Sequence, residues 1–133
     1  MIEPHVYSFV VSYGDSDAAG VLYYARYLNN SEKARLSWMD ALGYDWKNLH
    51  FQKNVIFPVR EVNIIYKKPF SLGDIVWIHT RLKSLQKYHL HLEQRFLNEK
   101  QELCTLCQIK VVCLKDNRLE PINRYFSDKK HEK

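Results

Sequence analysis

One stretch of helical periodicity, over residues 24–42, constrains the fold of this chain more than any other sequence feature. Gly43 follows it, where helices commonly end in a left-handed residue. A helix of roughly 19 residues is about 28 Å long, enough to cross a whole sheet. The side chains of its apolar face recur at steps of three and four residues; they are Tyr24, Tyr27, Leu28, Ser31, Ala34, Arg35, Trp38, Met39 and Leu42.

The rest of the chain is mostly typical of strands. Residues 6–13 are rich in β-branched and aromatic side chains. Residues 45–54 are interpreted as a loop, and Pro69 and Gly73 mark a later connection. The predicted order is β-α-β-β-β-β in one domain over residues 1–133, with a flexible tail at about 127–133. The four strands after the helix are predicted at residues 55–67, 74–85, 89–97 and 103–114.

Two of these strands alternate between apolar and polar residues. In the first, Val76, Ile78 and Leu82 share one face, opposite Trp77 and its polar neighbours. A sheet with one apolar and one polar face is expected to be antiparallel. One helix and one such sheet must pack on each other, so we predict an α+β fold with an antiparallel sheet wrapped around one long central helix. The open edge strand and exposed Trp77 favour a homodimer or homotetramer.

The loop before the helix, residues 13–20, has the sequence YGDSDAAG and combines two chemical requirements of acyl transfer, a carboxylate and backbone donors. Asp17 offers a carboxylate to attack a carbonyl or activate water. Gly20 lets the backbone turn close to a ligand. The unpaired amides of the first helical turn, near Tyr23 and Tyr24, offer an oxyanion hole. Aspartates before helices more often act as caps or turn residues, and that alternative applies to Asp15 and Asp17 alike.

The run from Val11 to Arg35 resembles the signature of 4-hydroxybenzoyl-CoA thioesterases and the related Tol-Pal-associated acyl-CoA thioesterases. The resemblance implies the hotdog fold and acyl-CoA thioesterase activity without a cofactor. It also implies that Asp17 is the catalytic carboxylate and that Asp15 shapes the loop. Where many Tol-Pal-associated relatives carry histidine, this chain has Tyr24, which favours the aryl-CoA relatives. Oxyanion and substrate contacts are expected from Gly20, Tyr23, Tyr24 and Tyr27.

Lysines at strand ends and turns are candidates for binding the CoA phosphates. We select Lys87 first and Lys83 second, and Lys67 and Lys68 complete the same basic rim. A solvated rim without a ligand is the alternative interpretation. Glu32 on the helix is a reserve catalytic candidate, because a helix glutamate serves in another hotdog branch.

Two groups of potential metal ligands are not expected to bind metal. Cys104 and Cys107 lie three apart on a strand and therefore face opposite ways. His79, His89 and His91 could form a zinc site only if the hairpin brought them together. We expect buried thiols, solvated or interface histidines, and no metal.

The composition limits the remaining alternatives. A net charge of +5 suits an anionic partner but does not identify it. The aromatics concentrate in the helix stripe and strand cores rather than among exposed basic residues, so we expect no nucleic-acid binding. The start of the chain lacks the basic and apolar regions of a signal peptide, and no membrane span is present. Together with the resemblance, which implies the activity, these limits lead us to expect a cytoplasmic acyl-CoA or acyl carrier protein thioesterase, or alternatively a non-hydrolytic hotdog protein that binds such thioesters.

Overall fold

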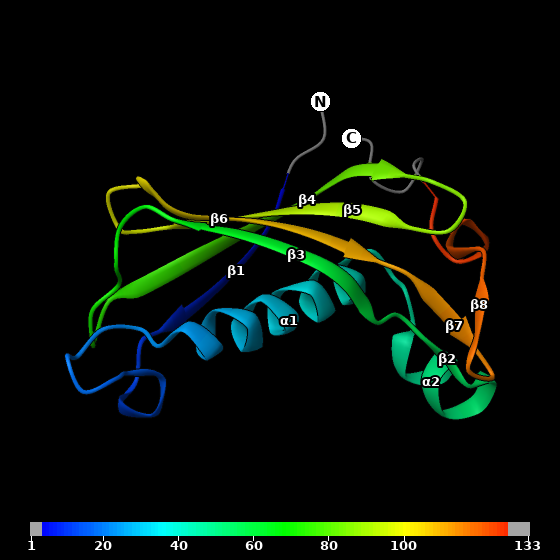
Figure 1. The fold of residues 1–133 in the computed structure, drawn as a ribbon, viewed down its shortest axis with the longest axis horizontal. Helices are drawn as coiled ribbons and strands as arrows, with labels where there is room; N and C mark the ends of the chain where they lie inside the picture. Colours follow the sequence, from blue (N-terminus) through cyan, green and yellow to red (C-terminus); the bar gives the residue numbers. More distant parts are fainter. Residues whose placement is uncertain (1–3, 128–133) are drawn as a thin grey trace.

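A computed structural model describes residues 4–127 of the chain. The long helix α1 spans Tyr24–Ala41 and lies across a curved sheet (Figure 1). Gly43 follows it with φ of 81°, the left-handed ending predicted from the sequence. The predicted α+β architecture of one long helix against an antiparallel sheet is confirmed. The division into one domain stays a prediction, and the predicted tail, apart from Ser127, lies outside the described residues.

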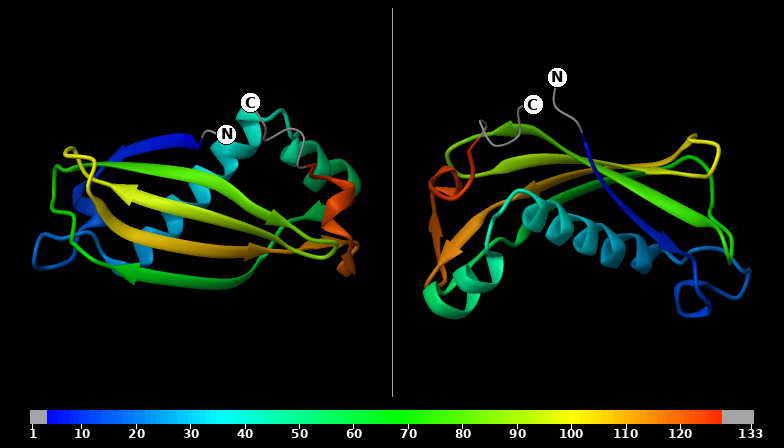
Figure 2. Two further views of the ribbon diagram at one scale, coloured as in Figure 1. Left: turned by 90° about the horizontal axis from the view of Figure 1, so that it is seen from above. Right: turned by 180° about the vertical axis from the view of Figure 1, so that it is seen from behind.

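The main sheet has five strands in the order β1-β4-β5-β6-β3, each pair antiparallel. In Figure 2 this sheet covers one side of α1, while the other side of the helix faces away from it. Strands β1 and β3 are the two edges. The strand bounds are β1 His5–Val10, β3 Val59–Tyr66, β4 Ile75–Leu85, β5 Leu90–Leu97 and β6 Leu103–Val111.

The core lies between α1 and the inner face of the sheet. Ala34 and Trp38 of the helix are buried against Ile78, Leu92 and other strand residues. A polar network crosses this interface: the Oγ of Ser31 donates to Oε1 of Gln94, and Nε2 of Gln94 donates to Oγ1 of Thr80 at 3.0 Å. Because each polar group finds a partner, the helix is held in one register on the sheet.

Two connections differ from the sequence predictions. The predicted loop at 45–54 contains a second helix, α2, over Trp46–Lys53. Asp45 caps it by accepting from the N–H of Asn48 at 3.0 Å, and Asn54 ends it at φ of 53°. Since no residue of α2 is buried, it lacks the apolar stripe by which a helix is detected in a sequence.

The predicted strands at 55–67 and 103–114 are each broken. Pro58 has no N–H to donate to a ladder, and its carbonyl accepts from the N–H of Val112 at 3.0 Å. A small second sheet forms beyond these breaks, in the order β2-β7-β8. Its strands are β2 Val55–Ile56, β7 Cys113–Lys115 and β8 Arg118–Glu120. Among the described residues, no helix is both long and apolar enough to cross a membrane.

Candidate active site at the start of the long helix

Asp17 occupies a tight hairpin turn between β1 and α1. Its main-chain carbonyl accepts from the N–H of Gly20 at 3.0 Å. Its side-chain Oδ1 accepts from the N–H of Ala19 at 2.8 Å and of Val21 at 3.3 Å. Gly20 adopts a φ of 78°, which a residue with a Cβ rarely adopts. The turn fixes the carboxylate through one oxygen, and Oδ2 has no hydrogen-bond donor among the described residues.

The carboxylate of Asp15 is hydrogen-bonded to the start of the loop. Its Oδ2 accepts from the N–H and Oγ of Ser12 at 3.1 and 2.9 Å. Its carbonyl accepts from the N–H of Tyr23 at 2.8 Å. Asp15 therefore ties the start of the loop to its end, as expected for a loop-stabilising carboxylate.

Helix α1 starts without a side-chain cap, and its N-cap residue is Tyr23. The N–H of Tyr23 is used by Asp15, and the N–H of Arg26 donates to the carbonyl of Tyr23 at 2.9 Å. The N–H groups of Tyr24 and Ala25 have no acceptor within residues 4–127. Of the two amides suggested by the sequence, that of Tyr24 is open to a ligand and that of Tyr23 is not.

A pocket of about 230 Å³ adjoins this turn. It brings together three of the predicted site residues, Asp17, Tyr24 and Tyr27, whereas Gly20 and Tyr23 do not line it. Gly20 instead belongs to the turn, where it adopts the positive φ. The remaining lining residues are Val21, Leu22, Tyr66, Lys67, Lys68 and Pro69.

Tyr66, the last residue of β3, was not singled out as a site residue. Its ring lies 4.9 Å from that of Tyr27 and 5.5 Å from that of Tyr24, measured between centroids. Burial raises the pKa of both Tyr27 and Tyr66 above the usual phenol value, so these hydroxyls remain protonated at neutral pH. The sequence signal for Tyr66 was its place directly before Lys67, Lys68 and Pro69.

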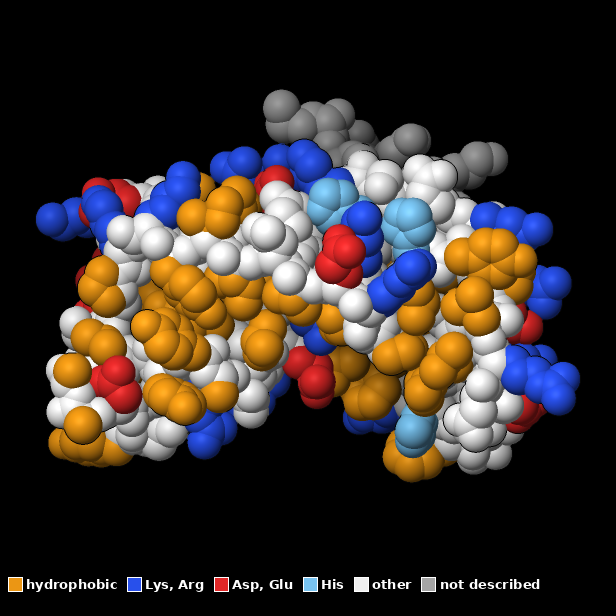
Figure 3. Space-filling view, in the orientation of Figure 1, with side chains coloured by type: hydrophobic (Ala, Val, Ile, Leu, Met, Phe, Trp, Pro, Cys, Tyr) orange, Lys and Arg blue, Asp and Glu red, His pale blue; other side chains and the backbone are white. Residues whose placement is uncertain are grey.

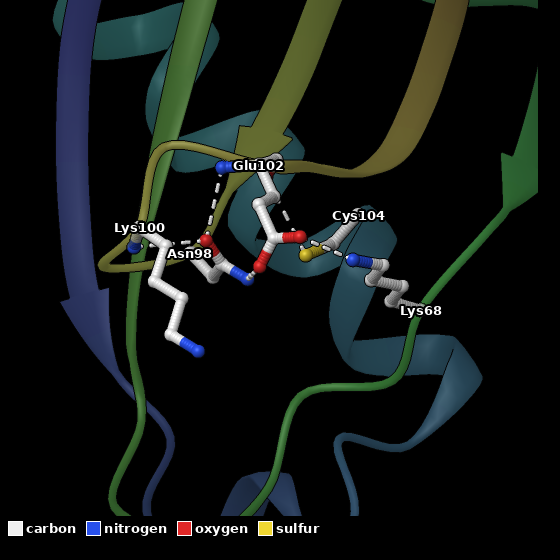
Figure 4. A network of polar contacts seen from close by, with 5 residues as sticks. All are labelled: Lys68, Asn98, Lys100, Glu102 and Cys104. Atoms are coloured by element: carbon white, nitrogen blue, oxygen red, sulfur yellow. Dashed lines mark hydrogen bonds and ion pairs between the residues drawn. The ribbon is translucent and has the colours of Figure 1, made fainter.

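The candidate lysines fall into two separate groups. Lys67 and Lys68 line the Asp17 pocket, and Nζ of Lys68 is paired with Glu102 (Figure 4). Strand β4 begins near this pocket, because Ser71, shortly before the strand, forms an isolated β-bridge with the lining residue Val21. Lys83 lies eight residues beyond Ile75 along β4, or about 26 Å at the usual rise per residue. Lys83, and Lys87 after it, therefore cannot reach Asp17 of their own chain.

Comparisons with known proteins identify the family. The model of the thioesterase-like superfamily matches residues 11–127, which include the Asp17 turn, α1 and every strand of the main sheet except β1. The chain belongs to the thioesterase-like superfamily.

Individual relatives agree with this membership. The acyl-CoA thioester hydrolase YbgC of Escherichia coli O6:H1 is 31% identical over 111 residues, covering 84% of this chain and 82% of its own. A DHNA-CoA thioesterase from Staphylococcus aureus superposes with a TM-score of 0.86 at 27% identity, covering 97% of this chain and 87% of its own. The BH1999 gentisyl-coenzyme A thioesterase gives a TM-score of 0.76 at 29% identity, with 81% and 88% covered.

A larger, apolar cavity lies near the other end of α1 of this thioesterase-like chain. Its volume is about 540 Å³, and its walls come from α1, α2, the sheet and Phe126. Trp38, Phe57 and Leu92 are typical of its apolar lining. Glu32, the reserve catalytic candidate, lines this cavity together with Arg35 rather than the Asp17 pocket.

The potential metal ligands are dispersed. In the β4–β5 register His79 lies opposite Arg95, and His91 lies opposite Ser84, so the hairpin does not make His79 and His91 cross-strand neighbours. Cys104 and Cys107 of β6 are both buried, as expected, and both belong to the hydrophobic core. No group of three or more potential ligands is gathered within residues 4–127.

Proposed function

We propose that this chain is a thioesterase that hydrolyses acyl-CoA thioesters to the free acid and CoA. One observation carries the proposal: the carboxylate of Asp17 and the open N-terminus of α1 share a single pocket. Both requirements of acyl transfer, a carboxylate and a pair of unpaired donors, are then met at one point. The names of the relatives, acyl-CoA thioester hydrolase, DHNA-CoA thioesterase and gentisyl-CoA thioesterase, support this reaction class.

In the proposed reaction, Asp17 acts as nucleophile or as general base toward water. Water supplies the new oxygen of the acid, either directly or by hydrolysing an acyl-Asp17 anhydride. The C–S bond breaks and the sulfur leaves as CoA thiolate, which then takes up a proton. The N–H groups of Tyr24 and Ala25 stabilise the negative charge that develops on the carbonyl oxygen. Gly20 shapes the turn, while Tyr24 and Tyr27 border the acyl group; no metal or prosthetic group takes part.

We also propose that the active unit contains two chains joined through β3. This edge strand is exposed along most of its length, and Figure 3 shows hydrophobic side chains gathered along it and the first half of α1. The exposed apolar residues there are Tyr24, Leu28, Val59, Val62, Ile65 and Tyr66. A two-fold axis pairs two copies of one edge strand antiparallel. The Tyr66 end of one copy then meets the Val59 end of its partner.

This pairing joins the Asp17 pocket of one chain to the large apolar cavity of the other. The Asp17 pocket includes Tyr66, and the large apolar cavity includes Val59. The thioester would lie at Asp17 of one chain, and its acyl group would enter the apolar cavity of the partner. Lys67 and Lys68 lie beside the Asp17 pocket and can bind the CoA phosphates there. Lys83 and Lys87 lie too far from Asp17 of their own chain, so they could bind phosphates only of a substrate held by the partner. Two such dimers would form the homotetramer.

The substrate class follows from the walls of these cavities. Tyrosine rings line the Asp17 pocket and tryptophan rings line the apolar cavity, and two of the three relatives named above act on aromatic acyl-CoA esters by their names. An aroyl-CoA is the proposed substrate, and an acyl carrier protein thioester is the second candidate. Because CoA esters are made and used in the cytoplasm, that is the proposed location.

A thiol-release assay tests the proposal across short-chain, long-chain and aromatic CoA esters. Asp17→Asn should lower kcat/KM by about 100-fold or more while the fold is retained. Asp45→Asn is the matched control, because Asp45 is also a loop aspartate whose side chain accepts a main-chain N–H, but it caps α2. Undiminished hydrolysis by Asp17→Asn would overturn the mechanism. Binding of CoA esters without hydrolysis of any of them would favour the non-hydrolytic alternative.

A further inference from the structure

The outer face of the sheet, turned away from α1, contains a small polar pocket that the proposed hydrolysis does not use. Its volume is about 240 Å³. Strands β4 and β5 supply its charged walls, with His79 and Arg81 on one strand and Glu93 and Arg95 on the other. The remaining lining residues are Pro4, Leu97, Gln101 and Leu103.

The charges of this pocket do not balance. Glu93 is the one carboxylate among its described lining residues, and it is buried. Its Oε1 accepts from Nε of Arg95 at 2.7 Å, and its Oε2 accepts from Nε2 of Gln108 at 3.4 Å and lies 3.9 Å from Nζ of Lys83. Glu93 is therefore committed to these neighbours. Although burial opposes its ionisation, the hydrogen bonds from Arg95 and Gln108 lower its pKa, so it stays charged.

Arg81 is left with an unused donor. It lies opposite Glu93 in the strand register, yet no carboxylate within residues 4–127 forms an ion pair with it. Its Nε is buried and has no hydrogen-bond partner in the described part of the chain. A buried guanidinium N–H without an acceptor costs free energy that a bound anion would remove.

We propose that this pocket is a binding site for a phosphate-type oxyanion, held by Arg81 together with Arg95 and His79. A guanidinium offers two parallel N–H donors that match two oxygens of one phosphate group. The volume suits inorganic phosphate, or the phosphate of a monoester whose organic part extends into solvent. The site lies on the face of the sheet opposite α1, so it is separate from the Asp17 pocket.

His79 provides a direct readout of binding. Burial, together with the positive charges of Arg81 and Arg95, lowers the pKa of its imidazole. The charged groups on the same face are Arg81 and Lys83 from β4 and Glu93 and Arg95 from β5, while Val6 of β1 lies opposite His79 in the register. A bound dianion would offset the cations and raise the pKa of His79.

The test is a titration of the whole protein with inorganic phosphate, followed by NMR of the histidine side chains. We expect a saturable shift of His79 and a raised His79 pKa, with chloride at matched ionic strength giving neither. Glycerol 3-phosphate in a parallel titration separates a phosphomonoester site, which saturates with both ligands, from a site for free phosphate, which saturates with inorganic phosphate alone.

Variants decide whether Arg81 holds the anion. Arg81→Gln should weaken phosphate binding roughly tenfold or more, because a charge-assisted hydrogen bond is lost. Arg124→Gln is the control, since Arg124 forms an exposed ion pair with Glu120 elsewhere. Arg95→Gln gives a second variant if Arg81→Gln does not fold. Equal affinity in folded Arg81→Gln, or no saturable shift in the wild type, would overturn the site. Thiol release from CoA esters should be unchanged in Arg81→Gln, so this test is independent of the proposed hydrolysis.

Discussion

The rings of Tyr27 and Tyr66 meet nearly edge to face, with centroids 4.9 Å apart and planes at 77°. Tyr27 lies on the buried side of α1, and Tyr66 is the last residue of the edge strand β3. This contact therefore links the helix that starts at the candidate active site to the edge proposed for dimerisation.

Substitutions at Tyr27 separate the ring from its hydroxyl. Tyr27→Ala should lower the free energy of unfolding by about 3–5 kcal/mol, because it removes a buried ring in contact with Tyr66, Phe70 and Phe96. Tyr27→Phe keeps the ring and should change the free energy of unfolding by less than about 1.5 kcal/mol. Urea unfolding measures both. Equal losses in the two variants would show that the hydroxyl, not the ring, stabilises this region.

Gly20→Ala should damage both stability and activity. A φ of 78° costs a residue with a Cβ about 1–2 kcal/mol, and relaxing the turn would shift the Asp17 carboxylate. Gly43→Ala introduces the same strain at φ of 81° beyond the far end of α1. It should lower the melting temperature to a similar extent while leaving kcat/KM unchanged. If both variants hydrolyse CoA esters as the wild type does, the shape of the Asp17 turn does not matter for catalysis.

The two edges of the sheet should respond differently to charge. The double variant Val62→Lys/Ile65→Lys places two lysines at the proposed β3 interface. Because burying unpaired charges is costly, this variant should be monomeric, as measured by light scattering. Val6→Lys with Val10→Lys places the same charges on the β1 edge, where residues 46% and 56% exposed are replaced, and should leave the mass unchanged. Dimers that persist in the β3 variant would contradict the proposed interface. Loss of hydrolysis together with dimerisation would support a site shared between two chains.

Thiol chemistry gives a pH prediction. All three cysteines are buried, and burial raises the pKa of Cys107 and Cys113 to about 11. The raised pKa depletes the reactive thiolate, by about a hundredfold at pH 8 relative to an ordinary thiol. Alkylation should therefore be very slow in the native protein and fast in urea. Rapid alkylation of Cys107 in the native protein at pH 8 would show that the β6 region opens locally.

The fold could be predicted from the sequence because one helical period and several two-residue periods leave few ways to bury their apolar faces. Residues 24–42 and β4 show this most clearly. Helix α2 could not be predicted in this way, since it buries no residue and is defined by its caps at Asp45 and Asn54. The break at Pro58 depends on a main-chain contact with Val112, which only the folded sheet brings close.

The candidate site could be predicted in part. Asp17, Tyr24 and Tyr27 are close together in the chain and meet in one pocket. Tyr66 comes from a distant strand, so its place there depends on the sheet register. The lysines were the weakest prediction, because charge alone does not tell which end of a strand a residue occupies. Arg81 and Glu93 look like ordinary alternating polar residues in the sequence; only the structure shows that Glu93 is hydrogen-bonded by Arg95 and Gln108 while Nε of Arg81 has no partner among the described residues.

The uncapped start of α1 has a consequence for how the protein responds to its ligands. A helix end without a cap frays more readily, so in the free protein the first turn should exchange its amide hydrogens quickly. A substrate or product carbonyl accepting from Tyr24 and Ala25 would take the place of the missing cap. Ligand binding should then appear as slowed hydrogen exchange at these two positions, making the first turn of α1 a built-in reporter of active-site occupancy.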